Sequence, residues 1–133
     1  MKIAVVTDDG KTISRHFGRA GGYLVFTIED GTILEQERRE KSGHQQFVHL
    51  HEQHSHTHEQ GHGMDPDSAV KHAAMIEPIR DCEVVIVRGM GQGAYLAIQE
   101  AHIRPIVTEL DDAEEAVRAY LDGTLADHPE RLH

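Results

Sequence analysis

The apolar positions in the first third of the chain fall into short runs that predict β-strands. Residues 2–7 hold an uninterrupted apolar stretch that stops at an Asp-Asp-Gly turn signal, which is typical of a strand buried on both faces. Residues 23–28 form a second run, and the Asp30-Gly31 turn that follows is a hairpin signal. Residues 32–39 carry charged or polar side chains at most positions, which predicts a more exposed strand at an edge of the sheet.

Predicted helices and strands alternate in the second half of the chain. The expected helices span residues 65–79, 94–101 and 111–122, and the expected strands span 84–87 and 103–108. Strands separated by helices should run parallel through right-handed crossovers, whereas the first three strands are joined by short turns and should be antiparallel. The pattern therefore predicts an α/β fold in which helices flank one mixed sheet of about five strands.

A histidine-rich segment interrupts this pattern. Residues 44–62 read HQQFVHLHEQHSHTHEQGH and hold seven of the chain's 12 histidines. Side chains two apart on an extended backbone, or three to four apart on a helix, point the same way and can share one metal ion. Imidazole suits zinc, copper, nickel and iron, and the absence of cysteine here excludes a thiolate-built zinc finger or iron–sulfur loop. The candidate ligands are His49, His51, His54, His56, His58 and His62. The alternative is a solvated polar linker.

Composition and charge narrow the class of protein. The chain has 133 residues and a formal net charge of −10, which argues against non-specific binding to nucleic acid or to an anionic membrane. A single cysteine, Cys82, excludes an internal disulfide and fits a reducing compartment. No signal-peptide or membrane-spanning pattern is present, so we expect a cytoplasmic protein. We expect one domain over residues 1–123 with an insertion at 44–64, and a flexible tail over 124–133.

Two basic residues and a histidine surround Phe17-Gly18 in the loop after the first strand. Arg15, His16 and Arg19 are an unusual group in so acidic a chain. They could hold an anion, with the imidazole of His16 as a metal ligand. The alternative is a loop that Phe17 anchors to the core while the charged side chains face water. The residue spacing alone leaves both interpretations open.

Three glycines and two carboxylates offer further candidate sites. Gly89, Gly91 and Gly93 follow a predicted strand and open a helix, whose N-terminal N–H groups can hold an anion. Their spacing is not a dinucleotide fingerprint and no P-loop lysine follows, so a tight strand-to-helix turn is equally compatible. Asp8 and Asp9 could hold Mg²⁺ as in a ribonuclease H-like nuclease, although a turn is the favoured interpretation.

Three stretches carry a family resemblance: residues 1–31 with the HFGRA motif, residues 84–94 with the glycine-rich turn, and residues 112–123. They resemble the dinitrogenase iron–molybdenum cofactor biosynthesis family, which includes nitrogenase cofactor carriers and the molybdenum–copper orange protein. The resemblance implies a ribonuclease H-like mixed sheet and a role for His16, the histidine of the HFG motif, in holding a cofactor. Arg88 and Met90 depart from the family's usual glycine-rich turn, as does the histidine-rich insertion.

These observations lead to three hypotheses. The first is a non-enzymatic carrier or scaffold for a metal or an iron–molybdenum type metal–sulfur cluster, exchanged with a donor or acceptor protein. An anionic cluster would rest on Arg15, Arg19 and backbone N–H groups, with His16 as ligand. The second hypothesis is a cytosolic buffer or sensor of zinc, nickel or copper that uses the histidine-rich segment alone. The third, ranked lowest, is a ribonuclease H-like nuclease.

Overall fold

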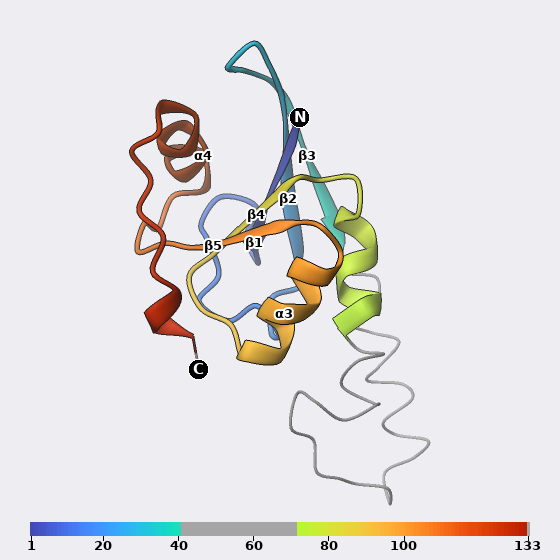
Figure 1. The fold of residues 1–133 in the computed structure, drawn as a ribbon. Coiled ribbons are helices and arrows are strands. Elements are labelled where there is room, and N and C mark those ends of the chain that lie inside the picture. Colours follow the sequence, from blue (N-terminus) through green and yellow to red (C-terminus); the bar gives the residue numbers. More distant parts are fainter. Residues whose placement is uncertain (41–71, 133) are drawn as a thin grey trace, which may run out of the picture.

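The computed structural model describes residues 1–40 and 72–132 of the chain. One five-stranded sheet has the order β3-β2-β1-β4-β5 (Figure 1). β1 pairs with β2, and β2 with β3, in antiparallel fashion, whereas β1 with β4 and β4 with β5 are parallel. The predicted mixed five-stranded α/β sheet is therefore confirmed, and its topology is compatible with a ribonuclease H-like fold. The strands are β1 Lys2–Thr7, β2 Gly22–Glu29, β3 Thr32–Glu40, β4 Val84–Val87 and β5 Arg104–Val107.

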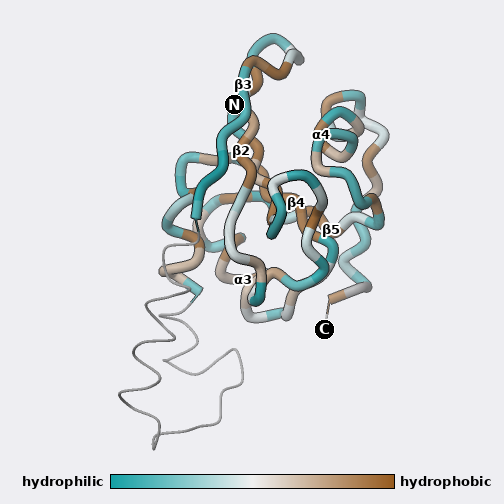
Figure 2. Tube along the Cα trace, turned by 180° about the vertical axis from the view of Figure 1, so that it is seen from behind, coloured by the Kyte–Doolittle hydropathy of each residue, from teal (hydrophilic) through white to brown (hydrophobic). Residues whose placement is uncertain are grey.

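The two outer strands match their sequence patterns. β3 is paired on one side only and is mainly exposed and hydrophilic, as expected of an edge strand (Figure 2). Asp30 and Gly31 both adopt positive φ angles, 53° and 74°, which close the two-residue hairpin between β2 and β3. β5 forms the other edge, where Pro105 lacks an N–H to donate.

Buried side chains form one hydrophobic cluster on each face of the sheet. In β1, Ala4 and Val6 belong to one cluster, and Ile3 and Val5 to the other. The first cluster packs under a helix at 72–76, which continues as the 3₁₀ helix η1 Glu77–Ile79, and under α3 Gln92–Glu100. The second packs under α4 Ala113–Asp122. The central strands are therefore buried on both faces, which explains their lack of polar alternation.

Local sequence signals predicted the ends of α4 correctly but placed the start of α3 too late. α4 begins where expected, because the Asp112 side chain caps the N–H of Glu115 at 2.9 Å, and it ends at Gly123 with a φ of 78°. α3 begins at Gln92, earlier than the predicted residue 94. Its N-cap is Gly91, which offers no side-chain acceptor, and a second glycine in the first turn, Gly93, weakens the helical pattern there.

Hydrogen bonds join the two sides of the histidine-rich insertion. Arg39, at the end of β3, bonds through Nη1 to the Pro78 carbonyl at 2.8 Å and to Asp81 at 2.7 Å. The hydroxyl of Tyr23 donates to the Met75 carbonyl at 2.6 Å. The histidine candidates at 49, 51, 54, 56, 58 and 62, and the predicted helix start at 65, lie outside the described residues.

The C-terminal segment lies along β5. The Val107 N–H donates to the Asp127 carboxylate at 2.9 Å, and the His128 N–H donates to the Val107 carbonyl at 2.8 Å. A short 3₁₀ helix, η2 Pro129–Arg131, follows, and Leu132 packs against the first cluster. The predicted flexibility of this tail stays a prediction. Among the described residues, no helix combines the length and apolar character needed to cross a membrane.

Candidate functional site

Three connecting segments meet where the parallel strands end, at the edge of the sheet that is formed by their C-terminal residues. The parallel strands β1, β4 and β5 end at Thr7, Val87 and Val107, and their C-terminal ends lie at the same edge (Figure 1). The segments that follow are the loop at 8–21, the turn at 88–91 and the connection at 108–112. In open α/β sheets ligands bind outside the carboxyl ends of the strands. A ligand site is therefore expected at this edge.

The two aspartates of the loop at 8–21 serve the loop itself. The Asp9 carboxylate accepts the N–H groups of Thr12 at 2.7 Å and Lys11 at 2.9 Å, and these bonds hold its pKa well below the usual range. The Asp8 carboxylate accepts the Gly21 N–H at 2.9 Å. Asp9 thus stabilises the turn and Asp8 holds the far end of the loop, which supports the turn interpretation over a magnesium site.

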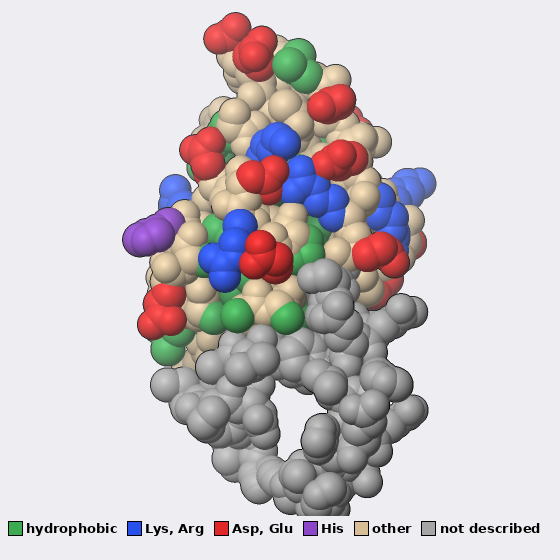
Figure 3. All heavy atoms as spheres, turned by 90° about the vertical axis from the view of Figure 1, so that its right-hand side faces the viewer, with side chains coloured by type: hydrophobic (Ala, Val, Ile, Leu, Met, Phe, Trp, Pro, Cys, Tyr) green, Lys and Arg blue, Asp and Glu red, His purple; other side chains and the backbone are tan. Residues whose placement is uncertain are grey.

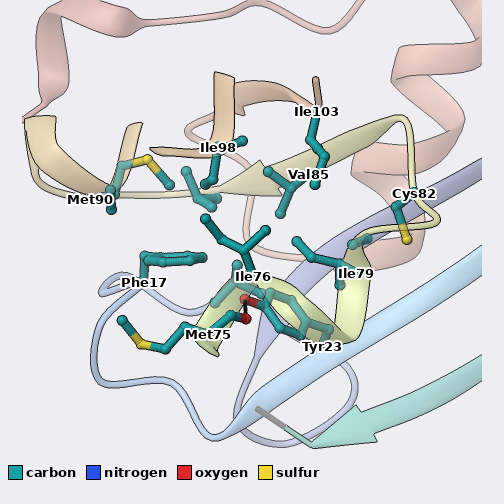
Figure 4. Close-up of a cluster of buried hydrophobic side chains, with 14 of the residues drawn as sticks. Phe17, Tyr23, Met75, Ile76, Ile79, Cys82, Val85, Met90, Ile98 and Ile103 are labelled. Carbon is teal, nitrogen blue, oxygen red and sulfur yellow. Dashed lines mark hydrogen bonds between the residues drawn. The ribbon is translucent and has the colours of Figure 1, made fainter. Parts of the chain in front are cut away.

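Phe17 fixes the loop to the protein. Its side chain is 1% exposed and lies at the same end of the first cluster as Met90 (Figure 4). Its backbone N–H donates to the Gly89 carbonyl at 3.0 Å. The bond joins the loop after β1 to the turn after β4, so the two groups of candidate residues are neighbours. Met90, a departure from the family pattern, is a core residue that anchors the glycine-rich turn.

The charged side chains of the loop remain at the surface. Arg15, His16 and Arg19 are all exposed. Neither Arg15 nor Arg19 forms an ion pair with any of the residues that the structure describes, and the same holds for Lys11 in this loop. Carboxylates pair with Arg38, Arg39, Arg80, Arg88 and Arg118, whereas the exposed Arg104 on β5, like Arg15 and Arg19, has no ion pair among the described residues. The three cations of the loop thus have no carboxylate partner among the described residues, since the loop's own Asp8 and Asp9 bond to backbone N–H groups.

Gly18, within the loop at 8–21, and Gly91, at the start of α3, are glycines without a structural need for glycine. A Cβ atom built on Gly91, the N-cap of α3, would meet nothing within 4 Å among the described residues, and the same is true of Gly18. Gly91 has a φ of −80°, which any residue can adopt. Gly93 lies in the first turn of α3, and the buried Gly89 carries the carbonyl bonded to Phe17. The helix N-terminus is thus open to close approach by an anion.

Arg88 does not add a free charge to this edge. Its Nη1 lies 2.8 Å from the Asp111 carboxylate, and its side chain is 20% exposed. The sequence predicted a charge beside the glycine-rich turn, and the structure supplies its counter-charge from the segment before α4. No local sequence signal indicated this partner, because Asp111 matches only a helix-start pattern.

The single cysteine does not contribute to the candidate site. Cys82 is 4% exposed and precedes β4, at the opposite edge of the sheet. Burial, together with the nearby Asp81 carboxylate, raises the pKa of the thiol to about 12. Cys82 therefore stays protonated at neutral pH and is a buried side chain of the first cluster. Within residues 1–40 and 72–132, no three His, Cys, Asp or Glu side chains gather as potential metal ligands.

The fold is that of a small α/β domain, and the exposed Arg15 and Arg19 lie in the loop that follows its first strand. The sequence model of the dinitrogenase iron–molybdenum cofactor family matches residues 1–123, and the chain belongs to this family. A comparison with curated proteins gives no match. Family membership supports a role in binding or carrying a cofactor or metal cluster.

Solved structures with the same fold cover nearly the whole chain. The apo orange protein from Desulfovibrio gigas superimposes with a TM-score of 0.63 at 19% identity, covering 95% of this chain and 91% of its own. A protein of Methanocaldococcus jannaschii, described provisionally as a dinitrogenase, gives a TM-score of 0.62 at 16% identity, covering 96% and 93%. At such low identities these likenesses establish the fold alone.

Proposed function

We propose that this protein is a non-enzymatic carrier or scaffold for an anionic metal–sulfur cluster of the iron–molybdenum type, bound at the edge formed by the loop at 8–21 and the start of α3. A cluster donor and a cluster acceptor protein would be its partners. The observation that carries the proposal is the unpaired charge of Arg15 and Arg19 in a chain whose net charge is −10. Unpaired cations next to a helix N-terminus favour the binding of an anion that is not part of the chain.

The ligand chemistry available to the chain supports a preassembled cluster. One buried, protonated thiol cannot supply the four thiolates that usually hold an iron–sulfur cluster. Arginine side chains and backbone N–H groups can instead bond to the sulfur surface of a finished anionic cluster. The exposed imidazole of His16, between the two arginines, would add one metal–nitrogen bond. Gly89, Gly91 and Gly93 would let the cluster approach the backbone.

Replacing His16 tests this arrangement. We expect His16→Ala to retain less cluster after reconstitution with a thiomolybdate or iron–molybdenum–sulfur cluster and desalting, measured by metal analysis and visible absorption. The unfolding free energy should change by less than about 1 kcal/mol, as for an exposed side chain. His102→Asn is the matched control, because it removes an exposed imidazole near the opposite edge and asparagine tolerates the positive φ of 64° there. Parental retention by His16→Ala would remove this residue from the site.

The density of histidines at 44–62 supports a second candidate function, which is buffering or sensing of a divalent transition metal. This activity would depend on neutral imidazoles and would be independent of Arg15 and Arg19. The same segment could instead collect metal for the first function.

A further inference from the structure

The loop that carries Arg15 and His16 crosses the edge of the sheet next to the end of β4. Ile13 packs in the cluster under α4, whereas Phe17 packs in the cluster on the other face. The residues between them must therefore pass from one face to the other. The Phe17 N–H bond to the Gly89 carbonyl fixes this crossing beside Arg88.

Arg88 lies on the α4 side of this crossing. In β4, Val84 and Ile86 face the α4 cluster and Val85 and Val87 face the other, so Arg88 continues the α4 face. Asp111, its partner, comes from the segment before α4 and also accepts the Ile13 N–H through its backbone carbonyl, at 2.7 Å. Asp111 therefore contacts the crossing loop with its backbone and Arg88 with its side chain.

Resting on the proposed function, we infer that Arg88 is a further anion-binding residue of the site and that Asp111 is the positioning residue that holds its guanidinium until an anion arrives. The Asp111 side chain is 74% exposed, so solvent weakens the hold of this carboxylate on the Arg88 guanidinium. A cluster of two or more negative charges competes for the guanidinium more strongly than one solvated carboxylate does. Arg88 then binds the anion beside the loop at 8–21, and Asp111 lowers the affinity enough for release.

The test is a titration of the full-length protein with tetrathiomolybdate at low and high salt. Arg88→Gln should weaken binding about tenfold, as expected for one charge-assisted hydrogen bond, and should reduce the salt dependence. Asp111→Asn, which keeps the backbone carbonyl bonded to Ile13, should tighten binding several-fold. The double variant should bind like Arg88→Gln alone, because Asp111 acts through Arg88. Arg88→Lys should fall between the parent and Arg88→Gln.

The ion pair between Arg118 and Glu114 on α4 supplies matched controls of equal charge, with 2.8 Å between the charged atoms. Arg118→Gln and Glu114→Gln should change tetrathiomolybdate affinity less than twofold. Equal effects of Asp111→Asn and Glu114→Gln, or additive effects of the Arg88 and Asp111 substitutions, would overturn the inference and leave the proposed function intact. Failure of the parent protein to bind tetrathiomolybdate would overturn both.

Discussion

Arg39 and Asp81 form a two-point ion pair, with Nη1 2.7 Å and Nη2 3.1 Å from the two carboxylate oxygens. Arg39 lies one residue before the end of β3, and Asp81 lies between η1 and β4, so the pair joins the two sides of the histidine-rich insertion. Lys2 extends the contact to β1 through a bond of 3.2 Å to the same carboxylate. On the face nearest these elements, acidic and basic side chains are interleaved (Figure 3).

Because these bonds connect the flanks directly, the fold should not need the histidine-rich segment. We predict that replacing residues 44–62 with a short Gly/Ser linker leaves unfolding cooperative and changes its free energy by less than about 1 kcal/mol. Urea unfolding followed by circular dichroism measures the change. Alkylation of Cys82 is a second readout, since the buried thiol should react only on unfolding. A broad transition, or reactive Cys82 without urea, would show that the segment belongs to the core.

The same ion pair should make the protein sensitive to acid. The bond from Arg39 lowers the pKa of Asp81 below its ordinary value of 3.8. A carboxyl group with a lowered pKa in the folded state stabilises the fold above its unfolded pKa, and this contribution is lost as the pH falls through the folded pKa. We therefore predict that stability falls below about pH 4 and that Asp81→Asn flattens this fall while lowering stability at pH 7. Glu35→Gln, an exposed control, should leave the slope unchanged.

Two glycines should respond to alanine in opposite ways. A Cβ on Gly22 would lie 2.5 Å from the Arg39 carbonyl, so Gly22→Ala must displace β3 and should cost about 1–3 kcal/mol. Gly91→Ala has space for its methyl group and should cost about 1 kcal/mol or less as a changed N-cap. If an anion approaches Gly91 closely, Gly91→Ala should nevertheless weaken tetrathiomolybdate binding. Unchanged binding by Gly91→Ala would place the anion away from the start of α3.

The sequence predicted the sheet well because burial on both faces leaves an unmistakable pattern in the short strands, and the pairing order then follows from turns and crossovers. Asp112 and Gly123 correctly predicted the two ends of α4, since each residue acts on neighbouring backbone groups. The partners of Arg88 and of the segment at 127–128 were not predictable, because these contacts join residues 20 or more positions apart through geometry that only the folded sheet creates. The proximity of His16 to the glycine-rich turn has the same origin.

Zinc binding should separate the two proposed metal functions. Metal requires neutral imidazoles, whose ordinary pKa is about 6.5, so zinc affinity of the histidine-rich segment should fall steeply from about pH 7 to 5. Mg²⁺ and Ca²⁺ should bind far more weakly than Zn²⁺, Ni²⁺ or Cu²⁺. Calorimetric titration of the parent and of the variant lacking residues 44–62 measures both effects. Equal zinc binding by the two proteins at pH 7 would make the segment a linker.

Retention of tetrathiomolybdate after desalting, compared between two variants, tests most directly where the anionic cluster is held. One variant lacks residues 44–62, and the other carries Arg15→Gln with Arg19→Gln. An Arg104→Gln and Arg118→Gln variant controls for overall charge, since both residues are exposed and lie on β5 and α4. We predict parental retention by the deletion and the control, and a loss of about tenfold or more in the Arg15 and Arg19 variant. Loss of the anion by the deletion, with parental retention by the Arg15 and Arg19 variant, would contradict the account.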